Sequence, residues 1–99
     1  MPVLPAFEDD ADDLRELLRR NPELRHLRVR KRASLLTVES GPKEDPVPHV
    51  RLRRVTLHKW TLEIAIHMGA WQPTGERSSM NDLVALVRQQ YPWVLRPIE

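Results

Sequence analysis

Arginines spaced two residues apart are the feature of this sequence best suited to binding chemistry. They occur within Arg28–Arg32 and again within Arg51–Arg53. Every second side chain of a β-strand lies on the same face, so two such strands side by side would gather their guanidinium groups on one surface. Guanidinium groups donate paired hydrogen bonds to carboxylates and phosphates. The predicted binding residues on these strands are Arg28, Arg30, Arg32, Arg51 and Arg53.

Two interpretations of this arginine surface remain open. Five arginines side by side would repel one another unless an anion or an acidic partner offset their charge. In the other interpretation the surface is solvated, with Glu63 and the loop acids as partial neutralisers. The chain has 13 arginines and 3 lysines, a bias that GC-rich coding also produces. Coding bias can explain the number of arginines but not their placement.

Trp71 is the tryptophan that we expect to be exposed. It follows a turn at Gly69 and precedes Pro73, which confines a strand to the edge of a sheet. Trp71 is therefore predicted to be an interaction anchor beside the arginines, whereas Trp60 and Trp93 are predicted to fill the core. The sequence lacks the interleaved exposed aromatic residues that proteins binding single-stranded nucleic acid use for stacking.

The histidines and acids form no recognisable catalytic or metal-binding motif. His49, His58 and His67 are nine residues apart, and neither an HxH nor an HxxxH pair occurs. His67 and Glu63 are expected to share one face of a strand, where they could act as an acid and base pair, although a solvent-facing histidine is the simpler interpretation. A nucleophile motif and a glycine-rich phosphate loop are also absent from the sequence. We predict no catalytic residue, no metal and no cofactor, and hence no enzyme.

Two amphipathic helices flank the predicted strands. Apolar residues recur at three- and four-residue spacing within Asp10–Arg20 and within Met80–Gln90, and a proline follows each segment. Residues 1–8 are expected to form a flexible arm before the first helix. The tail Trp93–Leu95 is too apolar to remain in solvent, so we expect it to pack on the core.

Three or four strands are expected between these helices. They are His26–Glu39, Val50–Leu57, Trp60–Met68 and a short edge strand, Ala70–Thr74. The first strand would bury Leu27, Val29, Ala33 and Leu35. The proline-rich residues 41–48 should form an exposed hairpin loop. The apolar alternation of the second strand slips at Arg53–Arg54, which predicts a β-bulge there.

The sequence therefore predicts an α+β fold in a single domain, residues 1–99. Two helices would lie on one face of an antiparallel sheet of three or four strands, in the order α-β-β-β-(β)-α, as a two-layer sandwich. That order resembles the double-stranded RNA-binding domain, in element order alone. The family contacts phosphates through lysines at the start of its last helix. Ser78–Asp82, at that position here, contain no lysine, so the resemblance transfers no RNA-contacting residue.

Composition and charge indicate the cellular location expected for this domain. The chain has no cysteine, a net charge of +2 and 40% hydrophobic residues. The lack of cysteine excludes a disulfide framework and a thiolate metal site. Because neither a signal-peptide pattern nor an apolar stretch of about 20 residues occurs, we expect a soluble cytoplasmic protein with no membrane contact.

These observations favour a small, non-catalytic interaction or regulatory domain that engages an acidic protein through its arginine surface. The alternative is that the same surface binds nucleic acid. A homodimer formed through an edge strand is also compatible with the sequence.

Overall fold

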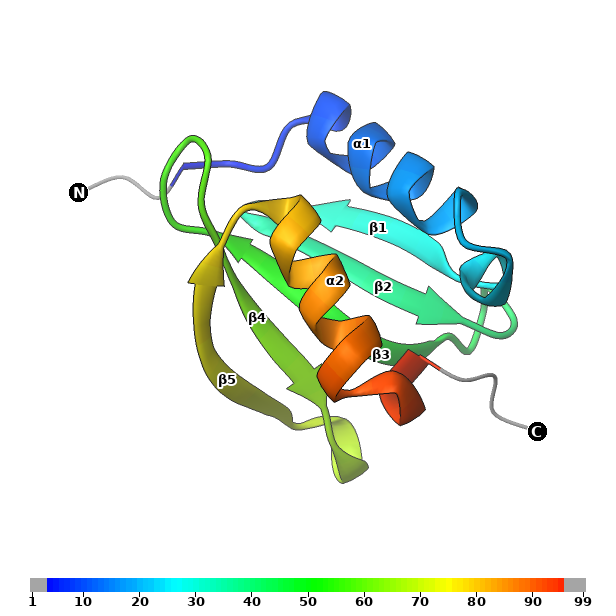
Figure 1. Ribbon diagram of the computed structural model, residues 1–99. Helices are drawn as coiled ribbons and strands as arrows, with labels where there is room; N and C mark the ends of the chain where they lie inside the picture. The colour runs from blue at the N-terminus through cyan, green and yellow to red at the C-terminus, as the bar shows by residue number, and fades with distance from the viewer. Residues whose placement is uncertain (1–3, 96–99) are drawn as a thin grey trace.

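The computed structural model describes residues 4–95 and confirms the α+β fold (Figure 1). Within these residues, five strands form one antiparallel sheet in the order β1-β2-β3-β4-β5. The strands are β1 (Arg28–Arg32), β2 (Leu35–Ser40), β3 (Val47–Arg54), β4 (Trp60–Ala65) and β5 (Trp71–Ser78). The helices are α1 (Glu8–Arg19) and α2 (Met80–Gln90), with short 3-10 helices η1 (Pro22–Leu24), η2 (His67–Gly69) and η3 (Pro92–Leu95). No helix in the described residues is long and apolar enough to cross a membrane.

Both helices lie on the same side of the sheet, as predicted (Figure 1). α1 packs against β1, and α2 packs against β4 and β5. α2 has the predicted bounds, and its first turn is capped by Ser79 Oγ, which accepts a hydrogen bond from the Asp82 backbone at 3.2 Å. The largest fully buried side chains lie between the two layers and are Leu14, Leu36, Val38, Leu62 and Leu83.

The prediction of one long strand over His26–Glu39 is wrong. A tight turn at Ala33 and Ser34 divides the segment into β1 and β2, which pair as a hairpin. Ala33 has a φ of 52°, a left-handed conformation that alanine rarely adopts, so no turn-forming residue marks this position in the sequence. Because the chain reverses, the buried positions change parity, and β2 buries Leu36 and Val38 instead of Ala33 and Leu35.

The predicted β-bulge at Arg53–Arg54 is also misplaced. The irregularity lies between Val38 and Glu39 of β2, opposite His49 of β3. The apolar alternation slips near Arg54 for another reason, since Arg54 itself occupies a buried position under the helices. β3 ends at Arg54, so the apolar residues that follow lie outside the strand.

Arg54 is buried because its guanidinium group has several partners. Nη2 donates to Asp10 Oδ1 at 2.9 Å and to the Leu57 carbonyl at 3.0 Å, and Nη1 donates to the Pro5 carbonyl at 3.1 Å. The guanidinium carbon lies 4.6 Å from the centre of the Trp60 ring. One buried arginine thus joins the segment before α1, α1 itself and the turn between β3 and β4.

The segment before α1 is anchored where a flexible arm over residues 1–8 was expected. The Ala6 backbone donates to the Ala33 carbonyl at 2.8 Å, and Ala6 is buried. The Phe7 backbone donates to Asp10 Oδ2 at 2.8 Å, which fixes the start of α1 two residues before the predicted position. Residues 1–3 of the expected arm lie outside the described part of the chain.

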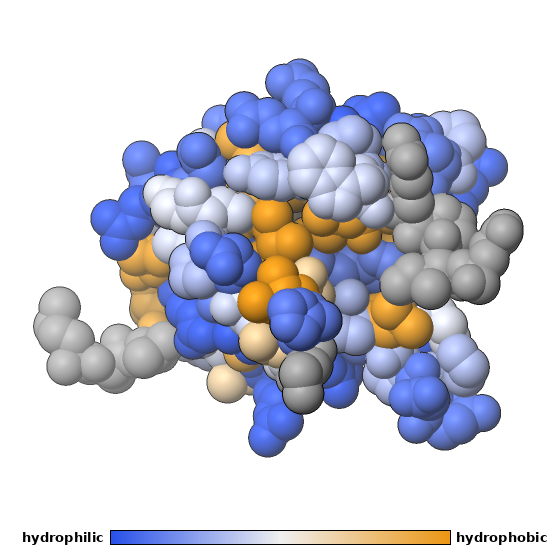
Figure 2. Space-filling view, turned by 90° about the horizontal axis from the view of Figure 1, so that it is seen from below, coloured by the Kyte–Doolittle hydropathy of each residue, from blue (hydrophilic) through white to orange (hydrophobic). Residues whose placement is uncertain are grey.

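The far end of the sheet differs from the prediction in two respects. β4 ends at Ala65, so Ile66 leaves the strand and is 41% exposed, and the side chain of Met68 is outside the described part. Trp60 is buried as predicted, but Trp93 is 61% exposed, whereas Leu95 of the same tail is buried. Figure 2, which views this end of the molecule, shows a small group of apolar side chains bordered by hydrophilic ones.

Truncation of Leu62 should test the division of β4 into core and surface positions. Leu62→Ala should lower the free energy of unfolding by about 2 to 5 kcal/mol, because a fully buried side chain leaves a cavity. Ile66→Ala should cost less than about 1 kcal/mol, since Ile66 lies beyond the strand. Urea unfolding of both variants would measure the difference, and equal costs would contradict the observed end of β4.

Candidate binding face of the sheet

The pairing of the strands brings the five predicted arginines onto the face of the sheet that the helices leave uncovered. Val29, Leu52 and Leu62 are buried under the helices, and the residues that alternate with them lie on the opposite face. We call this surface the open face. Its basic residues are Arg28, Arg30 and Arg32 of β1, Arg51 and Arg53 of β3, and Arg77 of β5.

Charge alternates from strand to strand across the open face. β1, β3 and β5 carry the six arginines, whereas β2 and β4 contribute Glu39 and Glu63 and no basic residue. Neighbouring strands lie about 4.8 Å apart, so each glutamate has arginines within reach on the adjoining strands. Oppositely charged cross-strand pairs of this kind are stabilising.

Glu63 is held by two arginines of β3. Arg51 donates from Nε and Nη2 to its two carboxylate oxygens at 3.0 and 3.2 Å, and Arg53 Nη2 lies 3.4 Å from Oε1. Only 13% of the Glu63 side chain is exposed. Burial alone would raise the pKa of Glu63, but the hydrogen bonds and charge of Arg51, with those of Arg53, lower the pKa below its ordinary value.

Glu39 is held less completely by the arginines of β1. Its side chain is 9% exposed, and Oε2 lies 3.5 Å from Arg30 Nη2 but has no hydrogen-bond partner within the described residues. Arg28, the direct cross-strand neighbour of Glu39, donates from Nη1 to the Gly41 carbonyl and leaves a buried Nη2 without a partner there. This corner of the open face therefore retains unused hydrogen-bonding capacity.

The open face keeps an excess of positive charge. Its six arginines exceed Glu39 and Glu63 by four positive charges, and Glu76 at the rim of the face reduces this excess to three. Arg32 and Arg77 are exposed and form no ion pair with the described residues, and Arg53 is 44% exposed despite its contact with Glu63. These three arginines and Arg30, whose side chain is 58% exposed, carry most of the charge available to a partner.

Sequence reasoning missed Arg77 because it ended the last strand at Thr74. β5 continues to Ser78, with a break in its pairing to β4 between Thr61 and Glu63. Thr74 Oγ1 donates to the Leu62 carbonyl at 2.9 Å and replaces a backbone donor at this break. Residues 75–78 lack an apolar alternation, so no signal in the sequence marks them as a strand.

The break in β5 leaves a hollow of about 500 Å³ on the open face. Arg53 and Arg77 stand on either side of it, with Thr61 and Pro73 among the residues between them. Glu76 also lines the hollow and is the one acidic residue at this part of the rim besides Glu63. The open face is thus not flat but indented between β3 and β5.

Trp71 lies on the open face but is not a free aromatic surface. The guanidinium carbon of Arg51 lies 4.4 Å from the centre of the Trp71 ring, and Trp71 is half-buried. The tryptophan thus supports Arg51 from one side while Glu63 binds it at its edge. The predicted anchor fixes an arginine in place.

The expectation that Glu63 and His67 share one face of a strand is wrong. β4 ends at Ala65, and His67 lies in η2 beyond the strand, so the two residues do not share a strand face. The Glu63 carboxylate is already held by two arginines, which stabilise its ionised form and oppose the proton transfer that an acid and base pair requires.

His49 has a structural role at the other face of the sheet. It is buried, with Nε2 2.7 Å from Ser40 Oγ and Nδ1 2.6 Å from the Val94 carbonyl, and so holds η3 against β3. Burial lowers the pKa of His49. The hydrogen bond to Val94 opposes this shift, and the nearby His26 adds to it.

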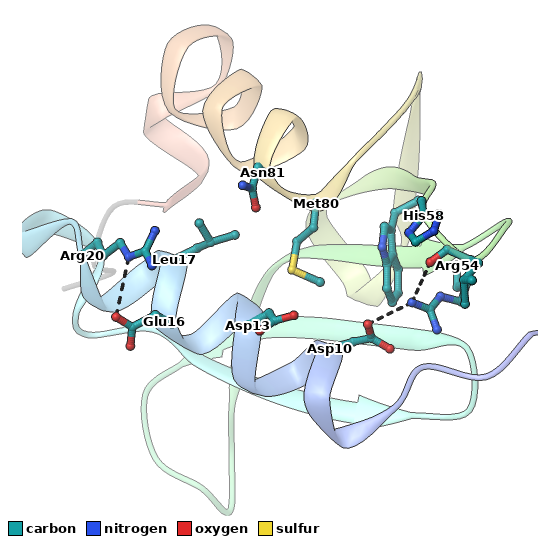
Figure 3. Close-up of a pocket in the computed structure, with 11 residues that line it drawn as sticks. Asp10, Asp13, Glu16, Leu17, Arg20, Arg54, His58, Met80 and Asn81 are labelled. Atoms are coloured by element: carbon teal, nitrogen blue, oxygen red, sulfur yellow. Dashed lines mark hydrogen bonds and ion pairs between the residues drawn. The ribbon is translucent and has the colours of Figure 1, made fainter.

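A second cleft, of about 390 Å³, lies between α1, the start of α2 and the turn after β3 (Figure 3). Three acids of α1 line it, but Asp10 binds Arg54 at 2.9 Å and Glu16 lies 3.6 Å from Arg20. Within residues 4–95, no group of three or more histidine or acidic side chains is placed to hold a metal ion. Since its acids are largely paired, this cleft is a weaker candidate than the open face.

A comparison of the chain with models of known protein families, with curated proteins and with solved structures finds no match. The geometry and charge of the open face are therefore the observations that bear on function.

The contribution of Glu63 to stability should depend on pH. Because its pKa is lowered in the folded state, the stabilisation is complete above the ordinary value of 4.5 and is lost as the pH falls through the lowered pKa. At pH 7, Glu63→Gln should lower the free energy of unfolding by about 1 to 3 kcal/mol, since charged hydrogen bonds are lost.

Urea unfolding at pH 7 and in steps down to about pH 3 would test this prediction. The free energies of unfolding of the original protein and of the Glu63→Gln variant should become more similar as the pH falls. A difference that stays constant over this range would show that the ion pairs of Glu63 contribute nothing.

Proposed function

We propose that this chain is a small, non-catalytic interaction domain whose open face binds an acidic surface of a partner protein. The observation that carries the proposal is the unbalanced positive charge that remains on this face after Glu39 and Glu63 are counted. Arginines held in fixed positions lose little conformational freedom on binding. Arg51 is held in this way between Trp71 and Glu63.

The glutamates of the open face favour a protein partner over nucleic acid. A nucleic-acid backbone carries a charge at every nucleotide and would place phosphates near Glu39 and Glu63. A protein can place its carboxylates opposite the arginines and uncharged groups opposite the glutamates. Arg51 lies over one face of the Trp71 ring, which reduces the surface that Trp71 offers for stacking with a base.

The two edges of the sheet support binding through the face rather than through an edge. β1 consists of charged residues apart from Val29, whose carbonyl accepts a hydrogen bond from Arg15 Nη2 at 3.1 Å. β5 contains Pro73, which cannot donate a backbone hydrogen bond, and is interrupted next to it. Natural sheets use charges, proline and irregular pairing to limit edge-to-edge association.

Binding measurements with an open-face variant should separate the two candidate partner classes. Fluorescence anisotropy would compare a labelled glutamate-rich peptide of mixed sequence with labelled duplex DNA and RNA at physiological ionic strength. We expect the protein to bind the peptide more tightly than either duplex. The double substitution Arg32→Gln and Arg53→Gln should weaken peptide binding about tenfold, as expected for two lost ion pairs of about 0.7 kcal/mol each.

The matched control is Arg19→Gln with Arg20→Gln at the C-terminal end of α1, which removes the same charge from the other side of the molecule. Its affinity for the peptide should stay within about twofold of the original. Tighter binding of a duplex than of the peptide, lost only in the open-face variant, would overturn the proposal in favour of nucleic acid.

A further inference from the structure

We propose that the acidic partner meets the open face as an α-helix that lies across the strands, with acidic residues seven positions apart. This inference rests on the proposed function and names the partner's form. It follows from the spacing of three arginines in one row across the sheet, two of which, Arg32 and Arg77, form no ion pair with the described residues.

Three arginines form a straight row across the sheet. In the register of the sheet, Arg32 of β1 lies beside Leu35 of β2, which lies beside Arg53 of β3. Arg53 in turn lies beside Thr61 of β4, which lies beside Arg77 of β5. The arginines thus stand on alternate strands, and because neighbouring strands are about 4.8 Å apart, their Cα atoms are spaced by about 10 Å. Arg32 and Arg77 form no ion pair within residues 4–95, and Arg53 between them is 44% exposed despite its contact with Glu63, so the row holds part of the unbalanced charge of the open face.

An α-helix matches this spacing and an extended strand does not. Seven residues of helix rise about 10.5 Å and complete nearly two turns, so every seventh side chain returns to the same face. In a strand, side chains on one face recur at about 6.7 or 13 Å, which misses a spacing of about 10 Å. Three acids at seven-residue spacing on a helix would therefore meet all three arginines.

The uncharged positions of the row indicate what lies between the acids. Leu35 is half-buried between Arg32 and Arg53, so it suits an apolar side chain three or four positions after the first acid. The hollow of about 500 Å³ between Arg53 and Arg77 can receive a side chain from the next turn. Glu76 lines this hollow, so an acidic side chain would be disfavoured there.

Three synthetic peptides of about 18 residues, five helical turns, would test the inference. The matched peptide carries three glutamates seven positions apart on an alanine-rich helix. A leucine stands three or four positions after the first glutamate. The shifted peptide has the same composition with its glutamates five positions apart, so they point around the helix. The broken peptide is the matched one with a central proline, which interrupts the helix.

The matched peptide should bind at least about tenfold more tightly than the shifted and broken peptides, because only it makes three ion pairs at once. Equal affinities for all three would overturn the helical partner and leave the proposed function standing. If none of the three peptides bound, both the helical partner and the proposed function would be overturned.

Two substitutions should locate the matched peptide on the row. Arg77→Gln should weaken the matched peptide severalfold and leave the shifted peptide within about twofold, whereas Glu76→Gln should strengthen the matched peptide by about twofold or more. Arg19→Gln on α1 serves as the control and should change neither. Equal effects of Arg77→Gln and Arg19→Gln on the matched peptide would contradict the proposed position of the helix.

Discussion

Helices cover only one face of the five-stranded sheet, and this constraint decides the role of almost every residue in the strands. Under α1 and α2, alternate positions are mostly apolar, as at Leu52 and Leu62, and the buried Arg54 is accommodated there by its hydrogen bonds. The intervening positions face away from the helices and are free to carry charge. Period-two alternation thus separates a hydrophobic core from an arginine-rich surface within the same eight residues of β3.

A surface of six arginines is compatible with folding because the adjoining strands supply the opposing charges. Glu63 is bound by Arg51 and Arg53, and Glu39 lies beside Arg30. These pairs hold guanidinium groups in place without neutralising the whole face. The structure therefore combines internal stabilisation of the sheet with a remaining positive charge, and the proposed interaction with an acidic protein rests on that remaining charge.

The sequence allowed prediction of the fold class, of α2 and of the arginines that share a face, because these depend on local periodicity. The two arginine-bearing strands, expected side by side, are instead separated by β2. The sequence did not predict the turn at Ala33, since alanine in a left-handed conformation gives no turn signal. Burial of Arg54 depends on Asp10, 44 residues away, and no local pattern shows such a pairing. The same limit applies to Arg77, whose place on the face depends on pairing with β4.

Titration of an isotope-labelled protein with a glutamate-rich helical peptide, followed by NMR, tests the central claim most directly. The side-chain Nε signals of Arg32, Arg53 and Arg77 and the backbone signals around them should shift. The indole signal of Trp60, buried on the helical side, should stay unchanged. Shifts confined to α1, α2 and the cleft between them, with the arginine signals unmoved, would contradict the assignment of the open face as the binding surface.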